Sequence, residues 1–129
     1  MRKSYVASLA VSLTLAASVS AAAGTLSTGY IYWSDNSELT TCSVTNVGSK
    51  PITITSVSLL DADSTELVPL SDSCMTAPLA PDTTCLWHGD VETFGGKIEF
   101  KGAAKSLRGR CLLRSSTTGE VLGPAADLR

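Results

Sequence analysis

The residues with distinctive chemistry in this 129-residue chain are four cysteines, one histidine and a late series of basic residues. His88 is the only histidine, so any acid–base role for an imidazole falls on it. Its phase is opposite to that of Cys85 and Trp87, which predicts a surface position if Trp87 is buried. The sequence holds no Gly-x-Ser-x-Gly elbow, phosphate-binding loop or His-Glu-x-x-His motif. We therefore expect a protein that is not an enzyme and that uses no cofactor.

Two groups of polar residues have spacings that a metal ion could use, and we interpret neither as a metal site. Cys85, His88 and Asp90 could supply three ligands, but zinc needs thiolates or imidazoles that converge, and this cysteine is expected to be oxidised. The acidic run over residues 61–66 has the spacing of a calcium loop. It lacks the glycine and the final glutamate of an EF-hand, so we interpret it as a turn.

The N-terminus has the pattern of a secretory signal peptide. Two basic residues follow Met1, residues 6–19 are apolar, and three alanines end the segment before Gly24. The apolar run is shorter than the about 20 residues of a membrane span. We expect residues 1–23 to be a cleaved signal peptide and residues 24–129 to form one domain. The expected location is periplasmic or secreted, with no transmembrane anchor in the mature chain.

The four cysteines all follow the expected signal peptide. An even number in a small exported chain predicts two disulfides, because the compartment is oxidising and the core is small. We favour Cys74–Cys85, which closes a short loop containing prolines, together with Cys42–Cys111, whose members share the inward phase of their strands. The other two pairings that four cysteines permit stay open.

The segments that must position these residues are short β-type runs between turn signals. Alternation such as Ile98 and Phe100 opposite Lys97 places one strand face inward and the other in solvent. Seven or eight such strands predict an all-β fold, an antiparallel β-sandwich. We expect a turn at Gly95 and Gly96 and a frayed tail over residues 123–129. The predicted strands cover residues 30–33, 39–47, 52–60, 66–70, 84–88, 97–100, 107–114 and 120–122.

Charge is distributed unevenly along the chain. Residues 24–96 carry nine acids and one base, whereas residues 97–129 carry seven bases and three acids. If the strands over residues 97–100 and 107–114 are neighbours, their outward basic side chains form one face. The residues of this expected basic face are Lys97, Lys101, Lys105, Arg108, Arg110 and Arg114.

Such a face would attract an anionic component of the cell envelope, an acidic glycan, lipid headgroups or another exported protein. The alternative is a solvated surface that Asp61, Asp63 and Glu66 partly neutralise. The chain as a whole carries a net charge of −2, which is too balanced for a nucleic-acid-binding protein. Tyr30, Tyr32 and Trp33 form an aromatic group that could contact a sugar or a protein partner, with ordinary packing as the alternative.

Several motifs carry a resemblance. A Cys-x-Val-x-Asn-Val strand end begins at Cys42, Pro51 leads the next strand, and a Cys…Pro-x-x-x-Cys loop ends at Cys85. With the late Leu-Arg strand at Arg108, this pattern resembles small exported bacterial proteins of uncharacterised function, over about residues 39–114. The resemblance implies an immunoglobulin-like sandwich, and a fold of this kind does not specify a function. The chain differs in placing its fourth cysteine at Cys111 instead of near residue 97.

The function we expect is that of an exported, non-catalytic binding or interaction module. Its ligand is unspecified by the sequence and would be anionic if the basic face is the contact surface. The alternative is a subunit or accessory factor of a cell-surface assembly. In that case residues 25–33 would donate a strand to an exposed sheet edge of a partner.

Overall fold

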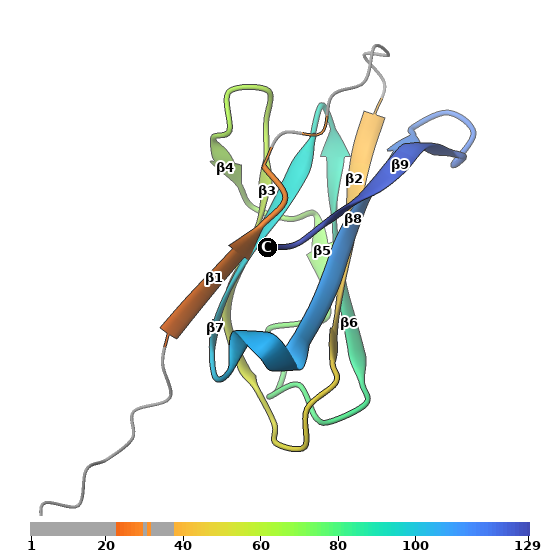
Figure 1. Ribbon diagram of the computed structural model, residues 1–129. Helices are drawn as coiled ribbons and strands as arrows, with labels where there is room; N and C mark the ends of the chain where they lie inside the picture. Colours follow the sequence, from red (N-terminus) through yellow and green to blue (C-terminus); the bar gives the residue numbers. More distant parts are fainter. Residues whose placement is uncertain (1–22, 30, 32–37) are drawn as a thin grey trace, which may run out of the picture.

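A computed structural model of the protein describes residues 23–29, 31 and 38–129 (Figure 1). The described residues form strands and one short 3-10 turn. These elements are β1 (Ala23–Ser27), β2 (Glu38–Asn46), β3 (Thr53–Leu60), β4 (Glu66–Leu67), β5 (Ser71–Asp72), β6 (Thr84–Val91), β7 (Gly95–Lys101), η1 (Ala104–Ser106), β8 (Leu107–Ser115) and β9 (Val121–Asp127). The predicted all-β class is confirmed. Within these residues no helix is long and apolar enough to cross a membrane.

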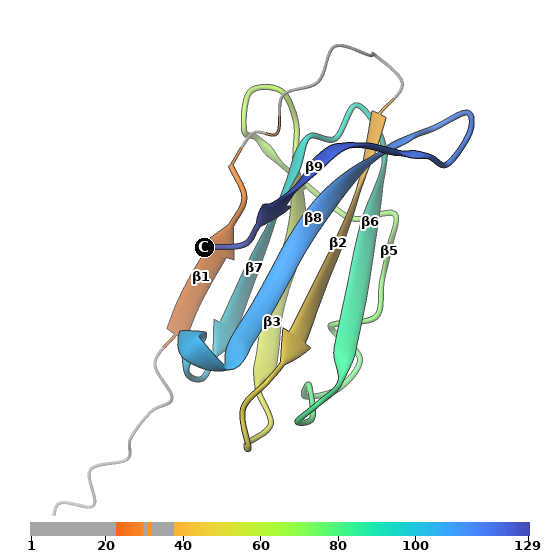
Figure 2. The same ribbon diagram turned by 45° about the vertical axis from the view of Figure 1, so that its right-hand side comes forward.

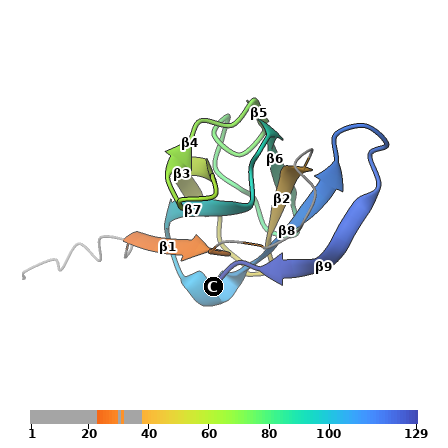
Figure 3. The ribbon, with the colours of Figure 1, turned by 90° about the horizontal axis from the view of Figure 1, so that it is seen from above.

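The strands form two antiparallel sheets that pack face to face, as the view along the strands shows (Figure 3). One sheet, which we call sheet A, has the order β1-β7-β3-β4. The other, sheet B, has the order β5-β6-β2-β8-β9. Strands β2, β7 and β8 largely alternate buried side chains toward the opposite sheet with more exposed ones toward solvent, so the two inner faces share one core. The predicted two-layered β-sandwich is therefore confirmed.

Three local predictions are wrong, and each has a physical cause. The strand predicted over residues 66–70 ends at Leu67 as β4 of sheet A. The next strand, β5 of sheet B, begins only at Ser71, after Pro69, which lacks an N–H. Gly95 and Gly96 are not a turn but the start of β7. The tail is ordered, because β9 pairs with β8 and extends to Asp127. The strand predicted at residues 30–33 lies outside the described residues, apart from Ile31.

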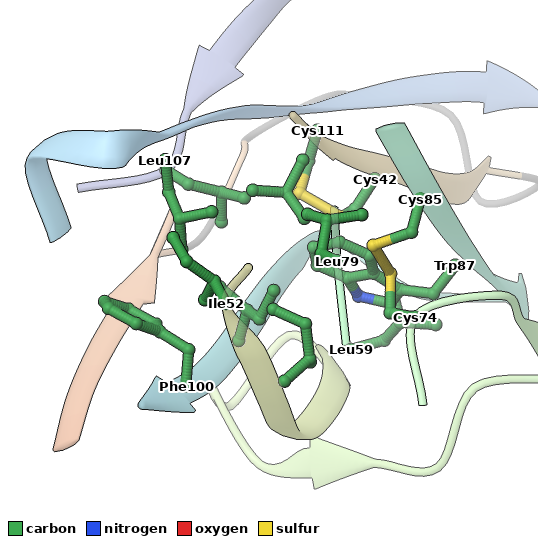
Figure 4. Packing of buried hydrophobic residues seen from close by; sticks show 14 residues of the cluster. Cys42, Ile52, Leu59, Cys74, Leu79, Cys85, Trp87, Phe100, Leu107 and Cys111 are labelled. Carbon is green, nitrogen blue, oxygen red and sulfur yellow. A yellow bond between two sulfur atoms is a disulfide. The ribbon is translucent and has the colours of Figure 1, made fainter. Parts of the chain in front are cut away.

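The core is centred on aromatic and aliphatic side chains from both sheets (Figure 4). Trp87 of β6 is fully buried, and its indole N–H donates a hydrogen bond to the carbonyl of Ser58 at 3.0 Å. Phe100 and Ile98 of β7 enter the core from sheet A. The hydrogen bond from Trp87 to Ser58 therefore links sheet B to sheet A and satisfies the buried indole N–H, in addition to the apolar packing.

Both favoured disulfides are present. Cys42–Cys111 links two residues that lie directly opposite each other on the neighbouring strands β2 and β8, so this bridge lies within sheet B. Cys74–Cys85 ties the loop after β5 to β6. Gly96 faces the first bridge across the core. A Cβ at Gly96 would lie 2.3 Å from the sulfur of Cys42, which explains why a glycine stands inside this strand.

The two sheets are joined along one flank by backbone hydrogen bonds at the end of the chain. The N–H of Ser27 in β1 donates to the carbonyl of Arg129 at 3.0 Å, and the N–H of Arg129 donates back to Ser27 at 3.1 Å. Figure 1 shows the C-terminus beside β1 accordingly. Sheet A and sheet B are therefore connected at this flank, which positions β9 and the residues that follow it next to β1.

Candidate anion-binding groove

The expected single basic face does not exist in the structure. Lys97 and Lys101 lie on β7 in sheet A, whereas Arg108, Arg110 and Arg114 lie on β8 in sheet B. The chain crosses from one sheet to the other through η1, so the inner faces of β7 and β8 oppose each other and their polar faces point apart. The alternation along each strand is as predicted, but alternation does not reveal which strands are neighbours.

Lys97 is occupied by acids of its own sheet. Its ammonium contacts the carboxylate of Glu66 on β4 and lies 3.4 Å from a carboxylate oxygen of Glu99. The hydrogen bond to Glu66 raises the pKa of Lys97 above its ordinary value of 10.5. Lys97 is charged at neutral pH with or without this shift. Any stability that the raised pKa represents is complete below pH 10.5 and is lost as the pH rises through the raised pKa. Lys97 is therefore part of an ion-pair network rather than a free binding cation.

Of the other five residues of the expected basic face, three lie outside the groove described below and two line it. Arg114 is half-buried, and its guanidinium donates to the carbonyl of Gly119 at 3.2 Å in the turn between β8 and β9. Lys101 and Lys105 are exposed near η1, outside any described cavity wall. Arg108 and Arg110 are the two that line a cavity, a surface groove of about 670 Å³ over sheet B.

The floor of this groove is the outer face of β2. Thr45 lies opposite Thr84 of β6 on one side and opposite Arg108 of β8 on the other. One pair further along, Ser43 lies opposite Arg110. A row of short hydroxyl side chains beside a row of long guanidinium side chains makes a trough in the sheet surface. The hydroxyls of Thr45 and Thr84 are 2.7 Å apart and hold each other in place.

The lining of the groove extends beyond β2 and β8, because residues of β1, η1 and the C-terminal segment also line it. The last backbone bond of the C-terminal segment to β8 runs from the N–H of Leu128 to the carbonyl of Gly109 at 2.9 Å. Leu26 of β1, Ala104 of η1 and Leu107 of β8 also line the groove. Figure 2 shows that η1 and the start of β8 lie near β1. The groove lining therefore mixes cationic, hydroxyl and apolar side chains, and the guanidinium of Arg108 lies beside the carbonyl of Leu107.

Positive charge dominates in the groove. Arg108, Arg110 and Arg129 line it, and Asp127 is the single acid among the described lining residues. One nitrogen of Arg108 donates to the carbonyls of Lys105 and Leu107, both at 2.8 Å, which fixes the side chain next to η1. A guanidinium has five N–H donors, so Arg108 keeps donors on its remaining nitrogens. This arrangement suits a carboxylate or phosphate group.

Most of the groove was not predicted from the sequence. Ser43, Thr45 and Thr84 are ordinary strand residues, and only the register of three strands brings them beside Arg108. Leu26 precedes every predicted strand. The outward phase of Arg108 and Arg110 was predicted, but the groove depends on residues far apart in the sequence.

The remaining sequence candidates do not join this site. His88 is half-buried on β6 opposite Thr41, in the phase opposite to the buried Cys85 and Trp87, as predicted. The carboxylate of Asp61 accepts the N–H groups of residues 63 and 65, both at 2.9 Å, so the acidic run is a turn as predicted. Within the described part of the chain no three potential metal ligands cluster. Tyr30, Tyr32 and Trp33 lie outside the described residues.

Comparison with known proteins adds no relative from which a function could be transferred. No family model matches the chain, and neither the curated proteins nor the solved structures include a significant match to it.

Proposed function

We propose that the protein is an exported, non-catalytic binding module that holds an anionic group in the groove over sheet B. The observation that carries this proposal is the convergence of Arg108 and Arg110 with the hydroxyls of Ser43 and Thr45 at the lining of one cavity. Charge-assisted bonds from guanidinium groups with hydroxyl donors nearby are the usual means of recognising carboxylate and phosphate. The two disulfides fit an oxidising compartment, which supports export.

The same proposal covers the domain organisation. Residues 1–23 would be the cleaved signal peptide, and residues 24–129 would form a single immunoglobulin-like domain of an exported bacterial protein. The sheet order supports this kinship in part. The neighbours β5-β6-β2 and β4-β3-β7 follow the two-sheet antiparallel plan of such sandwiches.

Retention on an immobilised polyanion tests the proposed function. We expect the protein to bind a heparin column and to elute as salt is raised, because salt screens exposed charges. The double substitution Arg108→Glu with Arg110→Glu should abolish retention. The matched control is Lys50→Glu with Lys101→Glu, which changes the net charge equally at exposed residues outside the groove. Equal losses in both double variants would show that net charge, and not the groove, causes binding.

The alternative function is assembly of several subunits through a strand edge, and the position of β1 at the end of sheet A supports it. Among the described strands β1 is at the end of sheet A and pairs with β7, and Ser27 at its end also pairs with Arg129. The rest of its outer edge is available to the same edge of another subunit. In the structure the segment Thr25 to Ser27 is already used within its own sheet. Size-exclusion chromatography separates the two functions, since assembly predicts oligomers that disappear when residues 25–29 are deleted.

A further inference from the structure

The outer face of sheet B presents two parallel rows across the groove, and each row contains one guanidinium group and one hydroxyl group. In the first row Thr45 of β2 lies opposite Arg108 of β8, and in the second row Ser43 lies opposite Arg110. All four residues line the groove. Figure 2 shows β2 and β8 running side by side. The groove therefore offers two similar places for an anionic group, one on each row.

The distance between the two rows is set by the geometry of the strand. Residues two apart in an antiparallel strand point to the same face and are about 6.8 Å apart along it. Arg108 and Arg110 are related in this way, and both are exposed. Arg108 has only one guanidinium nitrogen bound to backbone carbonyls, and Arg110 makes no hydrogen bond or ion pair with another described residue. Arg129 also lines the groove, but it pairs with Ser27 of β1 and so lies outside the two rows.

The series of cations along β8 is short. The next outward residue after Arg110 is the half-buried Leu112, and Arg114 beyond it donates to the carbonyl of Gly119. On its other side Arg110 faces Asp127 of β9, which repels an anion placed there. A polyanion with a charge on every unit would therefore place charges over Leu112 or Asp127, where they gain nothing or are repelled. A ligand with two separate charges about 7 Å apart matches the two rows.

We infer that the ligand is an extended acidic segment of a protein partner, with carboxylates at alternate positions. An extended chain repeats its side chains on one face every two residues, as the strands beneath it do. The two acids of a Glu-x-Glu sequence therefore reach both rows together. One carboxylate binds Arg108 beside Thr45, the other binds Arg110 beside Ser43, and the intervening residue points to solvent. This inference rests on the proposed function and names its ligand class.

Two peptides of equal charge and composition test the spacing. In acetyl-Ser-Glu-Ser-Glu-Ser-amide the carboxylates share one face of the extended chain, and in acetyl-Ser-Glu-Glu-Ser-Ser-amide they point to opposite faces. We expect the first to bind about five- to tenfold more tightly at low salt, because its second carboxylate binds intramolecularly. The amide signals of Ser43, Thr45 and Arg110 follow the titration. A peptide with one glutamate, acetyl-Ser-Glu-Ser-Ser-Ser-amide, should bind as weakly as the second peptide.

Removing either guanidinium should remove the advantage of the second carboxylate. In Arg108→Gln and in Arg110→Gln, the peptide with alternate glutamates should bind within about twofold of the peptide with one glutamate, as expected for coupled contacts. Arg114→Gln is the matched control, because Arg114 is on the same strand and outside the groove. This control should keep the full advantage. Dispersed amide spectra of each variant show that it has folded.

The outcomes separate the inference from the proposed function. A preference for alternate carboxylates that both arginine variants remove supports the two together. Equal binding of the two isomeric peptides overturns the paired spacing and leaves anion binding. Retention on heparin without binding of either peptide, or tighter binding of a disulfated disaccharide than of the peptide of equal charge, overturns the peptide ligand in favour of a glycan. No retention on heparin and no binding of any peptide overturns both proposals.

Discussion

Asn46 is a buried amide at the end of β2 whose hydrogen-bonding groups are all engaged. Its side-chain nitrogen donates to the carbonyl of Lys50 at 2.7 Å and to that of Leu79 at 2.9 Å. Its side-chain oxygen accepts the N–H of Gly48 at 2.9 Å. One side chain therefore shapes the loop to β3 and fastens it to the segment before β6. The asparagine in the Cys-x-Val-x-Asn-Val pattern thus has a structural explanation.

Replacing Asn46 by alanine should lower the free energy of unfolding by about 2–4 kcal/mol, because two carbonyls and one N–H lose their buried partner. Denaturant unfolding followed by circular dichroism measures the change. Thr53→Ala is the control, since Thr53 is exposed on β3. A loss below 0.5 kcal/mol for Asn46→Ala, about the size expected of an ordinary surface substitution, would contradict the role given to Asn46.

Thr40 presents the opposite case, a buried hydroxyl without a partner. Its side chain is 0% exposed on the inner face of β2, and its Oγ1 makes no hydrogen bond within the described residues. Thr40→Val keeps the shape and removes the unsatisfied group, so we expect stability to rise by about 1 kcal/mol. Thr40→Ser, which keeps the hydroxyl and loses the methyl group, should be less stable than wild type. A less stable Thr40→Val protein would show that this hydroxyl is satisfied in solution.

At the scale of elements, β7 shows what the sequence could and could not reveal. The alternation of Ile98 and Phe100 with charged residues predicted the strand and its inner face correctly. Gly95 and Gly96 indicated a turn, because glycine pairs usually mark one. The structure uses Gly96 for close approach to the Cys42–Cys111 bridge instead. A contact between distant segments decided this position, and no local pattern carries that information.

The pairing of β8 with β2 was likewise decided by contacts between distant segments, which no local pattern reveals. Strand phase is local, and it predicted the outward direction of Arg108 and Arg110. Sheet order depends on which strands bury their faces together, so the basic residues of β7 and β8 were wrongly expected on one surface. The disulfide pairing was predicted correctly because loop length and inward phase are both readable from the sequence.

The two disulfides should differ in how much they stabilise the fold. Cys42–Cys111 spans 69 residues and Cys74–Cys85 spans 11, so the chain-entropy model assigns them about 4 and about 3 kcal/mol. Removing the first bridge also leaves a void in front of Gly96, which adds to its cost. We expect the double alanine variant of Cys42 and Cys111 to unfold at lower denaturant than that of Cys74 and Cys85. The reverse order would contradict this ranking.

At the scale of the whole molecule, we expect export with removal of the signal peptide and, in the oxidising compartment, oxidation of all four cysteines to disulfides. We predict that the protein isolated from the cell envelope or the medium begins at Gly24 and contains no free thiol. N-terminal sequencing and thiol titration under denaturing conditions measure both. Cleavage before Gly24 would leave β1 with residues 24–27 to pair with β7. A purified protein that retains Met1, or that reacts with a thiol reagent, would contradict the prediction.

The backbone pair between Ser27 and Arg129 has a practical consequence for anyone who attaches a label to this protein. A peptide appended after Arg129 emerges beside Ser27 of β1, where Arg129 itself lines the groove. A polyhistidine or fluorescent fusion at that end would crowd the proposed anion site and mask weak association. Immobilisation through the exposed turn around Thr118, which connects β8 to β9, leaves the groove uncovered.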